Sequence, residues 1–248
     1  MLSLKGKLVL ITGASAGFGR ATALKMAELG ADVLAVARRK DKLTELTQKF
    51  SNITAVEQDI TKPLSTLEKV IQNRSVDILI NNAGLALGRD PIHKVKIEDF
   101  EAMMDLNVKA LVRVTQLVLP KMIEKKSGDI VNLGSIAGYF AYGGGSIYNA
   151  TKFAVRAMTE AWRQDLSGTG IRVIGIHPGM AETEFSLVRF RGDHDLARKP
   201  YEGFQPLTPE DVADSIVWSL LRPKHVNIQS MVIMPTDQAS IGMIHRRS

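Results

Sequence analysis

Seven short apolar runs, rich in β-branched residues, alternate with longer helical patterns along the chain of 248 residues. The runs cover residues 7–11, 32–37, 54–57, 77–80, 129–133, 172–177 and 231–234. Nearly continuous hydrophobicity is typical of strands that are buried on both faces of a parallel sheet. The helical patterns between the runs supply the crossover connections that parallel strands need. The sequence therefore predicts an α/β fold built on a parallel sheet.

The clearest helical patterns cover residues 20–29, 97–125, 146–166 and 209–221. The last one follows a capping Thr208, with proline at the first helical position and carboxylates after it. We find no second core and no internal repeat, so we predict a single doubly wound, Rossmann-like domain over residues 1–248, with seven strands and helices on both faces. Residues 180–205 are the least periodic stretch, and we expect a substrate-binding loop there.

The composition narrows the possible partners. The chain has 32 lysines and arginines against 26 aspartates and glutamates, but they are scattered without a basic block, so we expect no nucleic-acid partner. Because cysteine is absent, a disulfide framework, a thiolate nucleophile and a thiolate metal site are excluded, and no metal is expected. The apolar run at residues 8–11 is too short for a signal peptide or a membrane span. We therefore predict a cytoplasmic protein that does not bind membranes.

A glycine-rich turn follows the first predicted strand and precedes the first predicted helix. Gly13, Gly17 and Gly19 have the spacing Gly-x-x-x-Gly-x-Gly. Glycines at this place permit a tight turn and a close approach of a pyrophosphate to the helix N-terminus. The same residues could form an ordinary turn, but their position between strand and helix favours a dinucleotide site.

Two arginines follow the second predicted strand. A site for NAD usually has an acidic residue here, which accepts a hydrogen bond from the ribose 2′-hydroxyl. No acidic residue occurs between Val33 and Lys40, whereas Arg38 and Arg39 offer planar donors that can fork onto a 2′-phosphate. The alternative is a solvated basic pair at a strand end. We predict that the cofactor is NADP(H).

Tyr148 and Lys152 are four residues apart in the helical pattern 146–166. Residues at this spacing share a face of a helix, so the two side chains can point into one site. A phenol has a pKa of about 10, and a fixed cation nearby lowers it toward neutrality. Such a tyrosine can exchange a proton with an alcohol or a carbonyl oxygen. The pair therefore indicates hydride chemistry on a nicotinamide.

These features together resemble the short-chain dehydrogenases/reductases over essentially the whole chain. The matching residues are Thr12, Gly13, Gly17, Gly19, Asn81, Asn82, Ala83, Gly84, Asn107, Ser135, Tyr148 and Lys152. The resemblance implies that Ser135 hydrogen-bonds the substrate oxygen and that Tyr148 exchanges the proton. It implies that Lys152 lowers the Tyr148 pKa and holds the nicotinamide ribose, while Asn107 anchors a water in the proton relay.

The resemblance also assigns residues to the cofactor. Asp59 and Ile60 would contact the adenine, and Asn82 would border the adenosine ribose. Further cofactor-binding positions implied in the same way are Ser15, Phe18, Tyr148, Lys152, Pro178, Gly179 and Thr183. Each role has a simpler alternative. Ser135 could be only a turn residue, Asn107 could bond to the backbone, and His177 is expected to be a packing residue.

Three segments resemble one branch of the family, the NADP-dependent serine/L-allo-threonine dehydrogenases, also described as 3-hydroxy acid dehydrogenases. They are residues 82–88, 183–193 and 245–247. The resemblance implies a homotetramer that interconverts small 3-hydroxy acids and 3-oxo acids. The chain departs from the branch in residues 180–183, where such proteins usually have a β-branched residue or an additional glycine. Glu182 in this segment is next to the expected nicotinamide pocket and could alter the geometry of the loop, which leaves the substrate open.

A 3-hydroxy acid carries a carboxylate that needs a cationic partner once it is desolvated. We predict Arg189 and Arg191 as substrate-binding residues beside Ser135 and Tyr148. Arg246 or Arg247 is a second possibility, and ordinary surface charge is the alternative for all four. Other functions left open are a general carbonyl reductase, a sulfonate-aldehyde reductase and a non-catalytic NADP-binding regulator. A sugar-nucleotide epimerase would need a larger C-terminal domain.

Overall fold

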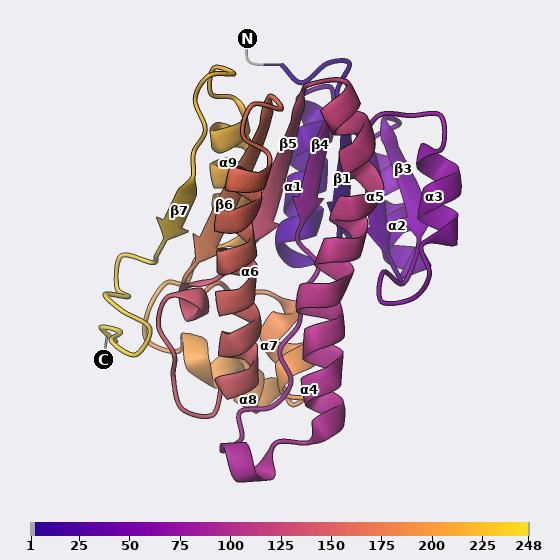
Figure 1. The fold of residues 1–248 in the computed structure, drawn as a ribbon. Helices are drawn as coiled ribbons and strands as arrows, with labels where there is room; N and C mark the ends of the chain where they lie inside the picture. Colours follow the sequence, from indigo (N-terminus) through magenta and orange to yellow (C-terminus); the bar gives the residue numbers. More distant parts are fainter. Residues whose placement is uncertain (1–2, 248) are drawn as a thin grey trace.

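The protein forms one seven-stranded parallel sheet, as seen in a computed structural model that describes residues 3–247 (Figure 1). The strands are β1 (Leu8–Thr12), β2 (Asp32–Ala37), β3 (Ile53–Glu57), β4 (Ile78–Asn81), β5 (Gly128–Leu133), β6 (Ile171–Pro178) and β7 (Ser230–Ile233). Their order is β3-β2-β1-β4-β5-β6-β7. All seven predicted strands are present, and their ends differ from the prediction by one residue at most. The predicted fold class is confirmed.

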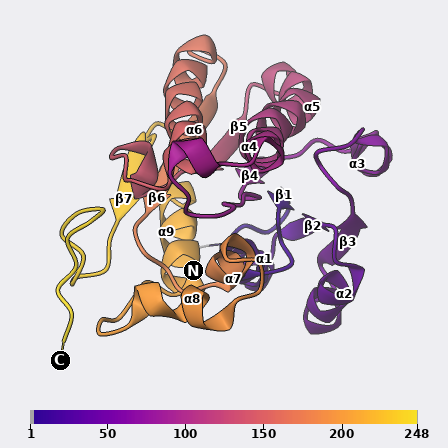
Figure 2. The ribbon, with the colours of Figure 1, turned by 90° about the horizontal axis from the view of Figure 1, so that it is seen from below.

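Helices cover both faces of this sheet. They are α1 (Gly17–Glu28), α2 (Lys40–Lys49), α3 (Ser65–Ile71), α4 (Ile97–Met104), α5 (Leu111–Glu124), α6 (Ser146–Asp165), α7 (Glu184–Arg189), α8 (His194–Arg198) and α9 (Pro209–Leu220). Figure 2 shows α1, α2 and α9 on one side of the sheet and α3, α5 and α6 on the other. Within residues 3–247, no helix is both long enough and apolar enough to cross a membrane.

The two helical layers explain why the strands are hydrophobic at nearly every position. In β1, Val9 and Ile11 belong to the core on the α1 and α9 side, whereas Leu8 and Leu10 belong to the core on the α3 and α5 side. Successive side chains of a strand point to opposite faces, so both sets are buried. Every residue of β1 is therefore buried.

The helix predicted over residues 97–125 is not a single regular α-helix. Between α4 and α5 lies a π-helical turn, Asp105–Ala110, in which the backbone is wider. Short π-helical stretches are frequent at functional sites, and this one contains Asn107. The predicted start of α9 is found as a reciprocal capping box between Thr208 and Asp211.

The loop predicted over residues 180–205 is largely helical. It contains α7, α8 and a 3-10 turn at Lys199–Tyr201, so its mixed polarity reflects short helices that are partly exposed. α7 begins at a capping Thr183, whose hydroxyl accepts from the Phe185 backbone N–H at 3.1 Å. The strand order reverses between β1 and β4, and this point at the carboxyl ends of the strands is where open α/β sheets bind ligands.

Candidate active site

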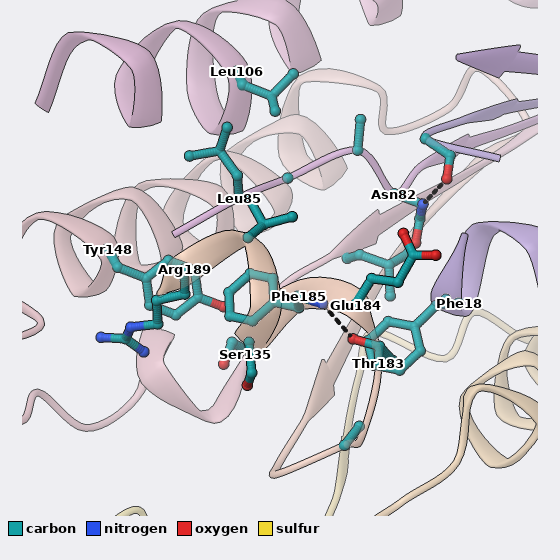
Figure 3. Close-up of a pocket in the computed structure, with 18 of the residues that line it drawn as sticks. Phe18, Asn82, Leu85, Leu106, Ser135, Tyr148, Thr183, Glu184, Phe185 and Arg189 are labelled. Carbon is teal, nitrogen blue, oxygen red and sulfur yellow. Dashed lines mark hydrogen bonds between the residues drawn. The ribbon is translucent and has the colours of Figure 1, made fainter. Parts of the chain in front are cut away.

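A cavity of about 840 Å³ lies between the carboxyl ends of the strands and the segment that carries α7. Figure 3 shows residues that line it, among them Ser135, Tyr148 and Arg189. The predicted site residues that line it are Gly13, Ser15, Gly17, Phe18, Arg38, Arg39, Asp59, Ile60, Asn82, Ser135, Tyr148, Lys152, Pro178, Gly179, Thr183 and Arg189. Gly19, Asn107 and Arg191 do not line it.

The glycine turn packs too closely against its neighbours for residues with a side chain. Gly13 has a φ of +68°, and a Cβ there would lie 2.9 Å from the Ala83 Cα. At Gly19 a Cβ would lie 2.4 Å from both the Asn82 amide nitrogen and the Gly13 carbonyl oxygen. The turn continues into the first residues of α1, which begins at Gly17, and free N–H groups and the helix dipole at this N-terminus favour an anion. This arrangement fits the pyrophosphate of a dinucleotide.

Asn82 holds the glycine turn against the end of β4. Its side-chain amide donates to the Thr12 carbonyl at 2.8 Å and to the Gly13 carbonyl at 3.2 Å. The Thr12 hydroxyl in turn accepts from the backbone N–H groups of Asn82 and Ala83, both at 3.1 Å. Asn82, which we expect beside the adenosine ribose, therefore also fixes the shape of the glycine turn.

The two arginines after β2 have different surroundings. Arg39 donates through Nε and Nη2 to the Ser15 hydroxyl at 3.2 and 3.1 Å, and through Nη1 to Glu184 at 2.8 Å. Arg38 is exposed at the cavity edge near Asp59. Burial acts to raise the pKa of Asp59, but hydrogen bonds from Thr61 outweigh it and hold that pKa below its ordinary value. Both guanidinium groups are within the cavity wall and fit a 2′-phosphate.

Tyr148 and Ser135 both line the cavity. Ser135 caps a 3-10 turn, Ile136–Gly138, where its hydroxyl accepts from the Ala137 N–H at 3.1 Å. Burial raises the pKa of Tyr148 well above its ordinary value, and the nearby Tyr142 adds to the increase. The hydrogen bond with Ser135 and the guanidinium of Arg189 lower it. The unliganded protein therefore keeps Tyr148 protonated at neutral pH, ready to donate a proton.

Lys152 lies one helical turn after Tyr148 in α6. Its ammonium donates to the Leu133 carbonyl at 2.8 Å and lies 5.9 Å from the centre of the Tyr148 ring. Burial lowers the pKa of Lys152 to about 8. The Lys152 ammonium is therefore charged at neutral pH. The groups that lower the Tyr148 pKa in this structure are Ser135 and Arg189, and not Lys152 as expected from the sequence.

Asn107 uses its side chain to hold backbone. Its Oδ1 accepts from the Leu85 N–H at 2.8 Å, and its Nδ2 donates to the Leu85 carbonyl at 2.8 Å and to the Thr151 hydroxyl at 3.1 Å. Thr151 in turn donates to the Tyr148 carbonyl at 2.8 Å. Asn107 thereby connects the cavity wall at Leu85 to α6, behind the residues that line the cavity.

Arg189, the last residue of α7, lines the cavity beside Tyr148. It donates to the Gly88 carbonyl at 3.0 Å and to the Tyr142 hydroxyl at 2.8 Å. Its guanidinium carbon lies 5.8 Å from the centre of the Tyr148 ring. Among residues 3–247 its Nη2 has no hydrogen-bond partner. This buried Nη2 is the Arg189 donor that remains for an anion next to Tyr148.

The other arginines considered for the substrate lie elsewhere. Arg191 donates through Nη2 to both carboxylate oxygens of Asp99, at 2.6 and 2.9 Å. Arg246 donates to the Pro200 carbonyl at 3.0 Å, and Arg247 pairs with Asp237 at 3.2 Å. None of the three lines the cavity.

Glu182, the position that departs from the family branch, is exposed and does not line the cavity either. Its backbone N–H donates to the Leu207 carbonyl at 3.0 Å. The departure therefore changes a solvent-facing side chain.

Several cavity residues were missed by the sequence analysis. They are Tyr142, Glu184, Tyr201 and Gln238, together with neighbours in the same walls. Gln238 accepts from the Met180 N–H at 2.8 Å, and Tyr201 donates to the Ala181 carbonyl at 3.0 Å, so both fix the segment after β6. None belongs to a spaced motif, and their positions depend on how the C-terminal part of the chain folds back over the sheet.

Residues 7–191 match the family model described as short chain dehydrogenase. The fold, the glycine turn and the clustered serine, tyrosine and lysine agree with this match. The chain belongs to the short-chain dehydrogenase family.

Several relatives within this family are similar to the chain over nearly their full length. The NADP-dependent 3-hydroxy acid dehydrogenase YdfG of Shigella flexneri is 42% identical over 247 residues, covering 97% of this chain and 100% of that protein. The serine 3-dehydrogenase of Rhizobium radiobacter is 41% identical over 247 residues, covering 97% and 98%. The closed form of a serine dehydrogenase complexed with NADP⁺ superposes with a TM-score of 0.92 at 42% identity, covering 97% of this chain and 100% of that one.

Proposed function

We propose that the protein is an NADP-dependent oxidoreductase that interconverts small 3-hydroxy acids, of the serine, allo-threonine and 3-hydroxypropanoate type, and the corresponding 3-oxo acids. The observation that carries the proposal is the position of Arg189 next to Tyr148, in the cavity that also contains Ser135. The names of the relatives that are about 42% identical over the full length support the same substrate class.

The cofactor assignment rests on the glycine turn and on Arg39. The turn suits a pyrophosphate, and the guanidinium of Arg39, which now donates through Nε and Nη2 to Ser15, would turn such donors to a 2′-phosphate. Bound NADP(H) supplies the hydride acceptor or donor. Neutral replacements of Arg38 and Arg39 should weaken the binding of NADP(H) far more than that of NAD(H). Equal weakening would show that the two arginines are only surface charge.

The proton chemistry is assigned to Tyr148, with Ser135 holding the substrate oxygen. In the direction of reduction, Tyr148 donates its proton to the carbonyl oxygen, and in the direction of oxidation it takes the hydroxyl proton. Lys152 supplies a positive charge behind the ring and a donor for the nicotinamide ribose. Asn107 connects the Leu85 backbone to Thr151 of α6. Its predicted contact with a relay water is part of the proposal.

A Tyr148→Phe variant tests this role, because it keeps the ring and removes the hydroxyl. It should abolish turnover and leave the affinity for NADPH nearly unchanged. Retained turnover would contradict the proton-transfer role.

The substrate carboxylate is assigned to Arg189. A charge-assisted hydrogen bond contributes about 1.5–3 kcal/mol, so Arg189→Gln should raise KM for hydroxy acids about 10- to 150-fold. Arg191→Gln is the matched control, since it removes the same charge two residues away, from a group paired with Asp99 outside the cavity. Equal effects of the two changes would remove Arg189 from the substrate site.

The substrate class is tested by following NADP⁺ reduction with L-serine, L-allo-threonine and 3-hydroxypropanoate, next to NAD⁺ controls. Turnover with these acids and NADP⁺ is the expected result. Oxidation of NADPH by neutral carbonyl compounds without turnover of any acid would instead indicate a general carbonyl reductase. Binding of NADPH without turnover of any substrate would favour the non-catalytic regulator.

We also propose a homotetramer. Two separate groups of exposed apolar side chains support it, one on α4 and α6 with Ile97, Phe100 and Phe153, the other on α9 and β7 with Trp218 and Val232. Two self-complementary surfaces are what a tetramer with three two-fold axes requires. Phe153→Glu should reduce the mass measured by light scattering, and an unchanged mass would remove the first surface. We place the enzyme in the cytoplasm, where NADP(H) is supplied, and cell fractionation tests this.

A further inference from the structure

Arg39 connects two opposite walls of the cavity. One edge of its guanidinium faces Ser15 in the glycine turn, through Nε and Nη2 at 3.2 and 3.1 Å. The other side, Nη1, donates at 2.8 Å to Glu184, which is 145 residues away in the chain and is the first residue of α7. All three residues line the cavity. The group suited to a 2′-phosphate is therefore already paired with a carboxylate.

Glu184 has no other side-chain partner among residues 3–247. The rest of α7 is attached independently of this ion pair. The Thr183 hydroxyl caps its start, Phe185 packs against Tyr148 with ring centres 5.5 Å apart, and Arg189 is bonded to Gly88. The Arg39–Glu184 pair can therefore break without displacing the helix.

A phosphate at Ser15 and the Glu184 carboxylate would be two anions on one guanidinium. Like charges repel, and a phosphate dianion attracts a guanidinium more strongly than a carboxylate does. Both side chains of the pair are also well exposed, 42% for Arg39 and 51% for Glu184, and exposed ion pairs are weak. The phosphate is therefore expected to displace the carboxylate at modest cost.

We propose that Glu184 is an internal competitor of the cofactor 2′-phosphate for Arg39. Binding of NADP(H) exchanges the Arg39–Glu184 ion pair for an Arg39–phosphate pair, whereas NAD(H), which lacks the phosphate, leaves the ion pair in place. Glu184 thereby weakens NADP(H) binding selectively and favours release of the spent cofactor, a step that often limits turnover. This inference rests on the proposed NADP-dependent function and adds a residue that sets cofactor affinity.

Equilibrium titrations of NADPH and NADH by nicotinamide fluorescence test the proposal without turnover. Glu184→Gln should lower the Kd for NADPH about two- to five-fold, the range of an exposed ion pair, and leave the Kd for NADH unchanged. Glu182→Gln is the matched control. It removes the same charge from an exposed side chain of the same segment that has no ion pair among residues 3–247, so the ratio of the two Kd values should not change.

A second comparison isolates the contact with Arg39. In an Arg39→Gln background, Glu184→Gln should no longer change the Kd for NADPH. A Kd for NADPH that is unchanged or higher in Glu184→Gln would overturn the proposal, as would an effect that persists without Arg39 or equals that of Glu182→Gln. A wild-type protein that binds NADH as tightly as NADPH would contradict the proposed function and this inference together. Wild-type preference for NADPH with an unresponsive Glu184→Gln variant would contradict the inference alone.

Discussion

His177 should make the stability of the protein depend on pH in a range where few other groups titrate. It lies in β6 and is only 2% exposed. Two glycines make room for its ring, since a Cβ at Gly134 would lie 2.1 Å from Nδ1 and one at Gly175 would lie 2.5 Å from Nε2. The edge of the ring meets Tyr139 at 85°, with centres 5.0 Å apart. The imidazole is therefore closely packed, and among residues 3–247 its buried Nδ1 has no hydrogen-bond partner.

This position disfavours the protonated ring. Burial is the main cause, and the cations of Lys152 and Arg156 add to it, so the pKa of His177 falls from 6.5 to about 4. The unfolded chain then binds more protons than the folded one between these values, and stability is lost as pH falls from 6.5 toward 4. The shift lowers the free energy of unfolding by about 2 kcal/mol between about pH 7.5 and pH 5, and by about 3 kcal/mol in full.

Urea unfolding at a series of pH values measures this effect. The wild-type protein should lose about 2 kcal/mol over the range, whereas His177→Gln, whose side chain is neutral throughout, should lose little, whatever its absolute stability. His225→Gln replaces an exposed histidine and should keep the wild-type slope. Carboxylates such as Asp59 lose their contribution only below about pH 4, outside this window.

The same slope in wild type and His177→Gln would refute the reasoning. If the variant does not fold, NMR titration of carbon-labelled histidine in the wild-type protein gives an independent answer. A His177 signal that titrates near its ordinary pKa of about 6.5 would then show that the buried ring is protonated without cost.

Two substitutions test the packing around the site, and a third tests a buried ion pair at the amino ends of β5 and β6, each by urea unfolding. Gly19→Ala places a methyl group 2.4 Å from an amide nitrogen and a carbonyl oxygen, so it should cost about 1–3 kcal/mol and weaken NADPH binding, whereas wild-type stability would contradict the tight packing. Asn107→Leu leaves the Leu85 backbone N–H and carbonyl without their partner and should cost about 2–4 kcal/mol; a loss below 1 kcal/mol would mean that water replaces the amide. Asp129→Ala removes the partner of the buried Arg172, paired at 2.6 Å, and should cost about 3–5 kcal/mol, far more than removal of an exposed charge.

Much of the site could be predicted from the sequence because it follows local rules. The glycine turn lies at the carboxyl end of β1 since strand, turn and helix succeed one another in the chain. Tyr148 and Lys152 share a face of α6 because of the helical repeat. Even the ends of the strands could be predicted to within one residue, since burial on both faces leaves a continuous apolar pattern.

Choices between similar residues were decided only in three dimensions. Arg189 and Arg191 are two positions apart, but Arg189 ends α7 beside Tyr148, whereas Arg191 follows it with a φ of +56° and turns to Asp99. No local pattern predicts that the segment after β6 crosses the carboxyl ends of the strands. Its partners come from distant parts of the chain, so they depend on the complete packing.

The sequence by itself determined the layers of this protein, the place of the cofactor turn and the spacing of the tyrosine and lysine. These features depend on backbone periodicity and on residues within a few positions of each other. Only the tertiary structure decided which arginine lies beside Tyr148 in the cavity, that Asn107 holds Leu85, and that Glu184 is paired with Arg39. Those contacts join side chains whose distance along the chain carries no signal, because the path of the chain across the sheet alone brings them together.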